Sequence, residues 1–181
     1  MNKDHIAGSE RRRLYLAGGL CALGVGLGVA RYVVTRPQPP AGHPLPVDFG
    51  DLAPGKLMTV DWHGRTVWIL RRSADDIAAL AGYESELADP ASLLSLQPEG
   101  CRNAHRSLRP ELFVAIGQCT HQGCPPALRS GAGNRAEFLC PCHSSKYDIA
   151  GRVFRSGPAP ANLVIPEYHL EGDSRVVIGE A

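Results

Sequence analysis

The chain has 181 residues, a length typical of one folded domain with additional segments. Its 19 basic and 18 acidic residues nearly balance, and neither a basic stripe nor an acidic tail suggests a nucleic-acid partner. Twenty glycines, 15 prolines and only 6% aromatic residues favour a turn-rich β protein over a helical bundle.

The N-terminal residues predict a membrane anchor. A polar leader, residues 1–13, ends in three consecutive arginines, and residues 14–34 are apolar apart from Arg31. At about 1.5 Å per residue, a helix over 14–34 can just span a hydrocarbon core of about 30 Å. A cleaved signal peptide would need an A-x-A site, which does not follow, and Leu20 is too large for lipoprotein processing at Cys21.

The basic cluster predicts the orientation of this anchor. Basic residues stay on the cytoplasmic side, so we expect a cytoplasmic N-terminus and a periplasmic head on a single-pass protein of a bacterial inner membrane. The consecutive arginines before an apolar run also resemble a twin-arginine export address.

Residues 35–47 contain five prolines and predict a flexible tether rather than a packed element. An extended proline-rich segment of this length reaches at most about 40 Å, at about 3.1 Å per residue. It is either a plain spacer or a hinge that lets the head swing between partners.

A head over residues 48–181 follows. Alternating apolar and polar residues from Leu57 to Leu70 predict a β-hairpin that turns at His63-Gly64. Ser73 begins a capping-box pattern for a short helix through Leu80, with Gly82 as its stop. Residues 83–110 predict a long irregular connection.

The rest of the head predicts short strands. A continuous apolar strand runs over Leu112–Ile116, and Phe138-Leu139 leads into a second loop. The chain turns at Ala150-Gly151, within Tyr147–Phe154, and three closing strands are expected at Leu163–Pro166, Tyr168–Leu170 and Arg175–Ile178. We therefore expect a mainly β, antiparallel head with two Cys/His loops at one tip.

These two loops carry the strongest chemical signal. One reads Cys119-Thr-His-Gln-Gly-Cys124 and the other Cys140-Pro-Cys-His-Ser-Ser145. Each supplies one soft thiolate and one imidazole, which suit iron or zinc. A zinc site leaves two cysteines unexplained, and a purely disulfide-bonded loop pair leaves both histidines unexplained. Cys101 has no assigned role; we expect a packed thiol, and the alternative is a further disulfide.

At these residues the chain resembles the Rieske iron–sulfur subunit of the respiratory cytochrome bc complex, and the resemblance extends to the anchor and the tether. It implies an antiparallel β-sandwich with a small cluster-binding subdomain over about 117–160. The implied cofactor is one [2Fe–2S] cluster per subunit. The implied ligands are Cys119 and Cys140 on one iron and His121 and His143 on the other, with a Cys124–Cys142 disulfide. The resemblance also implies a hydrogen bond from Ser145 to a bridging sulfide, one from Tyr147 to the sulfur of Cys119, and shielding by Gly157, Pro158 and Pro160.

The resemblance also implies a function. The chain would take one electron from quinol, and a proton through His143 or, second, His121, and pass the electron to a c-type cytochrome. Its partners would be cytochrome b and that cytochrome in a dimeric, proton-translocating quinol–cytochrome c reductase. The alternatives are the Rieske subunit of another exported oxidase, such as arsenite oxidase, and a membrane-anchored zinc-binding module. Gln122 and Ser144 depart from the family's usual Leu and Gly, which affects the expected docking.

Overall fold

The structure, a computed structural model, describes residues 43–131 and 135–179. The leader, the expected anchor over 14–34 and the greater part of the expected tether lie outside these residues. Within the described ranges, every helix is too short or too polar to cross a bilayer.

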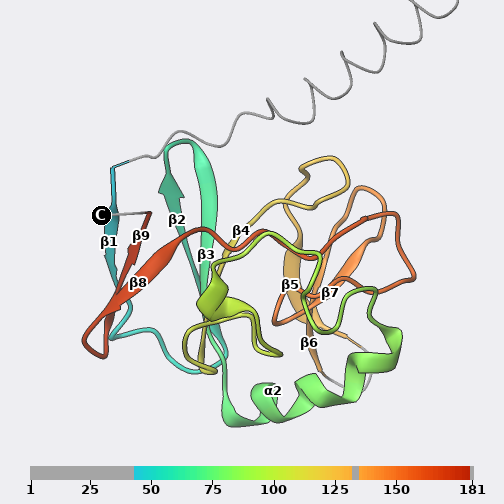
Figure 1. Cartoon of the computed structure of the whole chain (residues 1–181), viewed down its shortest axis with the longest axis horizontal. Helices are drawn as coiled ribbons and strands as arrows, with labels where there is room; N and C mark the ends of the chain where they lie inside the picture. Colours follow the sequence, from blue (N-terminus) through green and yellow to red (C-terminus); the bar gives the residue numbers. More distant parts are fainter. Residues whose placement is uncertain (1–42, 132–134, 180–181) are drawn as a thin grey trace, which may run out of the picture. The chain divides into compact units, whose positions relative to one another are not determined.

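In these described ranges, nine strands form three antiparallel sheets of three strands each, in the orders β1-β9-β8, β2-β3-β4 and β5-β6-β7 (Figure 1). The mainly β, antiparallel prediction is confirmed for the described head. The strands are β1 Leu45–Asp48, β2 Lys56–Trp62, β3 Arg65–Arg71, β4 Leu112–Ile116, β5 Ala127–Ser130, β6 Ala136–Leu139, β7 Lys146–Asp148, β8 Tyr168–Glu171 and β9 Arg175–Ile178.

Strand β1 corrects the expected end of the tether. Leu45, Pro46 and Val47 were assigned to the tether, but they pair with β9, where Leu45 faces Ile178. A proline is tolerated there because β1 is an edge strand and one of its sides needs no ladder hydrogen bonds. The start of the described chain is also held, since Trp62 Nε1 donates a hydrogen bond to the carbonyl oxygen of His43 over 3.3 Å.

The hairpin prediction is confirmed: β2 and β3 pair in register, from Lys56 opposite Arg71 to Trp62 opposite Arg65. His63 and Gly64 form the turn, both with positive φ, as a two-residue hairpin loop requires. Strand β4 has the predicted bounds and all five of its residues are buried, because it leads into the interior of the head.

The helix begins as predicted but ends differently. Ser73 caps α2, Ala74–Ala79, and the reciprocal bond from the Ser73 backbone N–H to Asp76 completes the capping box. Gly82 is not the stop, because the chain continues as a 3₁₀ helix, η1, over Leu80–Glu86. Apart from η1 and the short η2, Glu99–Cys101, residues 83–110 are irregular, as expected.

The expected strand at Leu163–Pro166 is absent from the described head. The backbone of residues 163–165 instead forms hydrogen bonds with three separate segments. Leu163 N–H donates to Gly151 O, Ile165 N–H donates to Leu96 O, and Val164 O accepts from Ile116 N–H. This stretch ties together the segments around the third sheet. The closing strands β8 and β9 form as predicted.

The third sheet contains a strand that the sequence did not indicate. Strand β5 pairs with β6, and β6 pairs with β7. The sheet joins the core through Phe138 of β6, whose ring stacks on Trp68 of β3 with centroids 4.7 Å apart. The two Cys/His loops are therefore attached to the main core through an aromatic contact.

Candidate metal centre

The first Cys/His loop connects β4 to β5 and is closed by two backbone hydrogen bonds. Cys119 N–H donates to Cys124 O over 2.9 Å, and Gly123 N–H donates to Cys119 O over 2.8 Å. Gly123 has φ +79°, a left-handed conformation that glycine adopts without a steric penalty.

The second loop connects β6 to β7 and repeats this frame. Cys140 N–H donates to Ser145 O over 2.8 Å, and Ser144 N–H donates to Cys140 O over 3.0 Å. Ser144 occupies the position that corresponds to Gly123, and it too has a positive φ, 58°. The departure from the family's glycine therefore falls at a strained backbone position.

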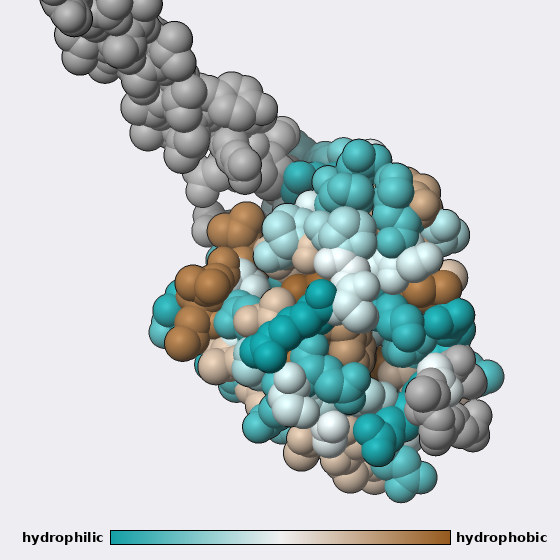
Figure 2. All heavy atoms as spheres, turned by 90° about the vertical axis from the view of Figure 1, so that its right-hand side faces the viewer, coloured by the Kyte–Doolittle hydropathy of each residue, from teal (hydrophilic) through white to brown (hydrophobic). Residues whose placement is uncertain are grey.

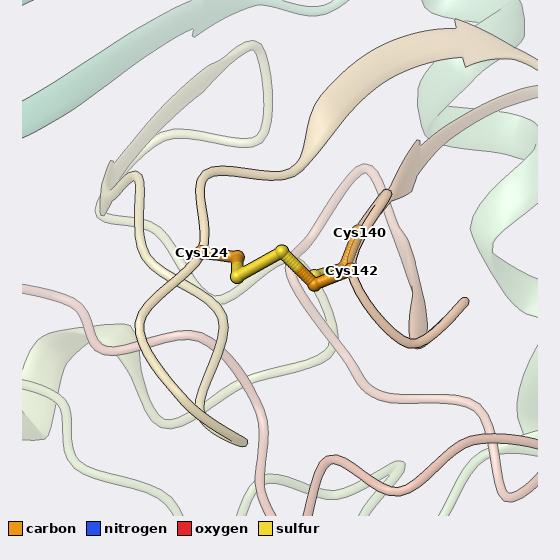
Figure 3. Close-up of side chains that lie close together, drawn as sticks. All are labelled: Cys124, Cys140 and Cys142. Carbon is orange, nitrogen blue, oxygen red and sulfur yellow. A yellow bond between two sulfur atoms is a disulfide. The ribbon is translucent and has the colours of Figure 1, made fainter.

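The two loops are joined covalently. Cys124 and Cys142 form a disulfide, with their Cα atoms 6.5 Å apart, and Figure 3 shows the bridge running from one loop to the other. This confirms the expected pairing. Cys119 and Cys140 stay as buried free thiols, 3% and 1% exposed, which leaves them available as ligands.

Tyr147 of β7 lies against the first loop. Its hydroxyl is 3.2 Å from Cys119 Sγ and accepts a hydrogen bond from the Thr120 backbone N–H over 3.1 Å. The Thr120 hydroxyl, 3.1 Å from the same oxygen, uses its proton on Ala161 O. The Tyr147 proton is therefore free to point at Cys119 Sγ, because a thiolate accepts and cannot donate.

The surroundings of Cys119 favour its thiolate. Burial alone opposes ionisation, but hydrogen bonds from the Tyr147 hydroxyl, the His121 backbone N–H and the side chains of Cys140 and Ser145 outweigh it and lower the pKa of the Cys119 thiol. Metal ions bind the thiolate form of cysteine, so this environment suits a ligand.

The predicted imidazole ligands lie side by side. The rings of His121 and His143 are 4.7 Å apart at their centroids and meet edge to face. Buried Nδ1 of His121 has no hydrogen-bond partner in the described head. Because buried polar atoms are normally paired, this nitrogen fits a metal ligand. His143 is the more exposed of the two.

The segment expected to shield the cluster touches the second Cys/His loop. A Cβ on Gly157 would come within 2.8 Å of Ser145 Cα, so only glycine allows this approach. Ala159 N–H donates to the Ser145 hydroxyl over 3.1 Å, which leaves the Ser145 proton free to donate elsewhere. Pro158 and Pro160 are exposed on the outer side of this segment.

A buried ion pair lies directly behind Tyr147. Arg152 Nε is 2.7 Å from Asp148 Oδ2, and both side chains are at most 1% exposed. Asp148 Oδ1 also accepts the backbone N–H groups of Ala150 and Arg152. Arg106, fully buried, donates to the carbonyl oxygens of Ala150, Gly151 and Leu163. These bonds hold the turn after β7 against the 161–165 segment.

Sequence reasoning missed several members of this site. Thr120 and Ala161 connect Tyr147 to the shielding segment, and Asp148, Arg152 and Arg106 form the support behind it. Thr120 lies within the Cys/His motif, so its position was a usable signal. A single sequence gives no sign that an arginine is buried, because most arginines are exposed.

The donor set fits two irons better than one zinc ion. Among the described residues, the group with at least three ligand atoms mutually within 4.8 Å is Cys124, Cys140 and Cys142, and two of these are used by the disulfide. The four predicted ligands do not form such a compact group, which a tetrahedral zinc ion with bonds of about 2.0–2.3 Å needs.

Cys101 lies apart from this site. Its thiol is fully buried next to the Tyr168 hydroxyl, 3.5 Å away, and burial raises its pKa. The expectation of a packed thiol is confirmed.

Comparison with known proteins matches the region that contains both Cys/His loops to a known family. Residues 101–169 match the Rieske [2Fe-2S] domain family. The chain is 40% identical over 183 residues to the ubiquinol-cytochrome c reductase iron-sulfur subunit of Allochromatium vinosum, covering 94% of this chain and 88% of that protein. It is 42% identical over 136 residues to the mitochondrial Rieske subunit of the cytochrome b-c1 complex of Zea mays, covering 75% of this chain and 45% of the relative. The chain thus aligns with about half the length of this mitochondrial relative.

Among solved structures, a chain of a hyperthermophilic respiratory Complex III matches with a TM-score of 0.47 and 27% identity. The match covers 88% of this chain and 98% of that one.

Proposed function

Because the chain belongs to the family of Rieske iron–sulfur subunits of ubiquinol–cytochrome c reductase, we propose that it carries single electrons from quinol to a c-type cytochrome. The chain itself is an electron carrier, and any proton translocation belongs to the whole complex. The observation that carries the proposal is the convergence of two thiols and two imidazoles on a pair of loops joined by one disulfide.

The ligand assignment rests on the family to which the chain belongs. Cys119 and Cys140 hold one iron as thiolates, and His121 and His143 hold the other as neutral imidazoles. Such a mixed set supplies, when the cluster is bound, a one-electron centre at roughly −150 to +300 mV, compared with about −400 mV for an all-thiolate set. Tyr147 stabilises the thiolate of Cys119 by its hydrogen bond, and Ser145 has a free hydroxyl proton to donate.

His143 is the proposed proton acceptor. It is exposed at the loop tip, whereas His121 is half-buried, so a quinol hydroxyl reaches the His143 ring first. Loss of the electron favours release of the ring proton, because added positive charge opposes protonation. We expect a reduction potential that falls at alkaline pH by up to about 59 mV per pH unit for each coupled proton. A potential independent of pH would exclude this role.

A metal and spectroscopic measurement tests the ligand set. The chain matured in a host that assembles iron–sulfur clusters should contain two irons, acid-labile sulfide and a low-temperature EPR signal after dithionite reduction. Replacing His121 or His143 with Ala should abolish the signal. Replacing the exposed His63 or the half-buried His169 with Ala is the matched control and should leave it intact. Zinc without colour would support the interaction-module alternative instead.

The membrane arrangement is part of the same proposal. Residues 14–34 anchor the chain with residues 1–13 in the cytoplasm, the tether follows, and the head docks on a membrane-embedded cytochrome b in a dimeric complex. The 40% identical relative is a subunit of ubiquinol–cytochrome c reductase, which favours this complex over an arsenite-oxidase-type partner. Protease digestion of right-side-out and inverted vesicles tests the orientation: the head should be cleaved only in the first. Lengthening the tether should slow turnover without changing the cluster spectrum.

A further inference from the structure

Three leucines on one loop are unusually exposed. Leu93, Leu94 and Leu96 are 66%, 85% and 70% exposed, the highest values among the large apolar residues that the structure describes. The surrounding residues 90–98 contain no charged side chain. Apolar residues gather at one edge of the face in Figure 2. Large apolar side chains that are clustered and exposed commonly mark an interaction surface.

The loop is built to hold these leucines outward. The carboxylate of Asp89 accepts the backbone N–H groups of Leu93 and Leu94 and the Ser95 hydroxyl, over 2.7–3.1 Å. Gln97 Nε2 donates to Ser92 O over 2.6 Å and closes the same turn. The three side chains are therefore displayed by an ordered turn, so docking a partner on them costs little additional conformational entropy.

This leucine loop is bonded to residues 161–165, which directly follow the segment expected to shield the metal centre. Asn162 Nδ2 donates to Asp89 O over 3.0 Å and to Ser92 Oγ over 3.2 Å. Ile165 N–H donates to Leu96 O over 3.1 Å. One residue before Asn162, Ala161 O accepts the Thr120 hydroxyl of the first Cys/His loop. Residues 161–165 thus link the leucine loop to the first Cys/His loop.

We propose that Leu93, Leu94 and Leu96 form an apolar docking surface for the membrane-embedded subunit that holds the quinol site. The inference rests on the proposed function, which requires the head to approach that subunit. An uncharged, leucine-rich surface can be buried against that subunit without desolvating a charge, and removing its apolar side chains from water is itself favourable. The patch is a second contact, linked to the first Cys/His loop through residues 161–165, and it orients the loop tip toward the quinol.

The test uses the assembled complex in native membranes and in detergent. The variant replaces all three leucines with serine, L93S/L94S/L96S, and its matched control is Leu108→Ser. Leu108 is 40% exposed, but its backbone N–H bonds to Tyr168 of β8, outside the leucine loop. Two rates are measured separately: reduction of the centre by quinol and its oxidation by the c-type cytochrome. EPR and thermal unfolding check that each variant retains the centre and the fold.

We expect quinol-driven reduction to slow by about tenfold or more in the triple variant, equivalent to about 1.4 kcal/mol of docking free energy. Its oxidation rate should equal that of the unmodified complex, and Leu108→Ser should change neither rate. Unchanged reduction overturns the proposal, as does slowing of oxidation alone, which would place the patch on the acceptor side. An effect in membranes that vanishes in detergent would assign the patch to the bilayer and also overturn it. Failure of quinol to reduce even the unmodified centre would instead refute the proposed function.

Discussion

The Tyr147 hydroxyl lies 3.2 Å from Cys119 Sγ, in a position where its proton has the thiolate as its strongest acceptor. Tyr147 is fully buried, and the Thr120 N–H fixes its oxygen from the other side. This contact joins β7 to the first Cys/His loop and places a hydrogen-bond donor on a predicted iron ligand.

Replacing Tyr147 with Phe should lower the reduction potential. The donor stabilises the more negative, reduced state, and a hydrogen bond contributes about 0.5–1.5 kcal/mol, equivalent to about 20–65 mV for one electron. Protein-film voltammetry measures the shift. Tyr168→Phe removes another buried hydroxyl, one that bonds to Leu108 and Cys101 away from the centre, and should leave the potential unchanged. Equal shifts in both variants would contradict a specific role for Tyr147.

Replacing Arg152 with Ala should lower the free energy of unfolding of the head. The change leaves Asp148 buried without its charge partner, which typically costs about 3–5 kcal/mol. Arg155→Ala is the matched control, because that exposed arginine makes only a 3.3 Å bond to Ser85 O and should cost less than about 0.5 kcal/mol. Denaturant unfolding measures both free energies. A cost below about 1 kcal/mol for Arg152→Ala, no more than that of an average point substitution, would show that the pair is dispensable.

Replacing Ser144 with Gly should stabilise the head. Ser144 has φ 58°, and a left-handed conformation costs a residue with a Cβ about 1–2 kcal/mol, partly offset by the greater unfolded-state entropy of glycine. We expect a net gain of about 0.5–1 kcal/mol in the free energy of unfolding. The reverse change at the corresponding position, Gly123→Ala, should destabilise the head. A loss of stability in the Ser144 variant would show that its side chain makes a contact that outweighs the strain.

Asp89 should give the leucine loop a pH-dependent stability. Burial raises its pKa, but hydrogen bonds from Ser95, Leu93 and Leu94 outweigh burial and lower it below the usual 3.8. Its stabilisation is therefore fully present above the unfolded pKa and is lost as the pH falls through the lower folded value.

Asp89→Asn should therefore cost about 1–3 kcal/mol at pH 7, and the difference from the unmodified chain should shrink below about pH 4. Unfolding curves between pH 3 and pH 7 measure it. Asp51→Asn, at an exposed position, is the control and should have no effect. A difference that stays constant over this range would mean that the charge of Asp89 is not involved.

Several elements were predictable because their signals are local. The alternation around His63-Gly64, the capping box at Ser73 and the apolar run of β4 each depend on neighbouring residues, and the structure has them where expected. The two Cys/His motifs likewise indicated the metal-binding loops and the cysteine pair that forms the disulfide.

The incorrect predictions concern backbone groups with distant partners. Apolar residues at 163–166 indicated a strand, but their hydrogen bonds go to Gly151, Leu96 and Ile116, which lie far away in the sequence. Gly82 indicated a helix end, yet η1 continues through it. Strand β1 was assigned to the tether because its partner, β9, lies at the opposite end of the head sequence.

The sequence by itself determined which side chains can bind metal, because thiol and imidazole chemistry depends on residue type and their spacing lies within short loops. Only the tertiary structure decided how Arg106 and Arg152 are buried behind Tyr147, and how the leucine loop is bonded to residues 161–165. Some of these contacts join residues more than 70 positions apart in the sequence: 72 from Arg152 to Leu80 and 73 from Asn162 to Asp89. Such pairings follow from packing the whole chain rather than from any local pattern.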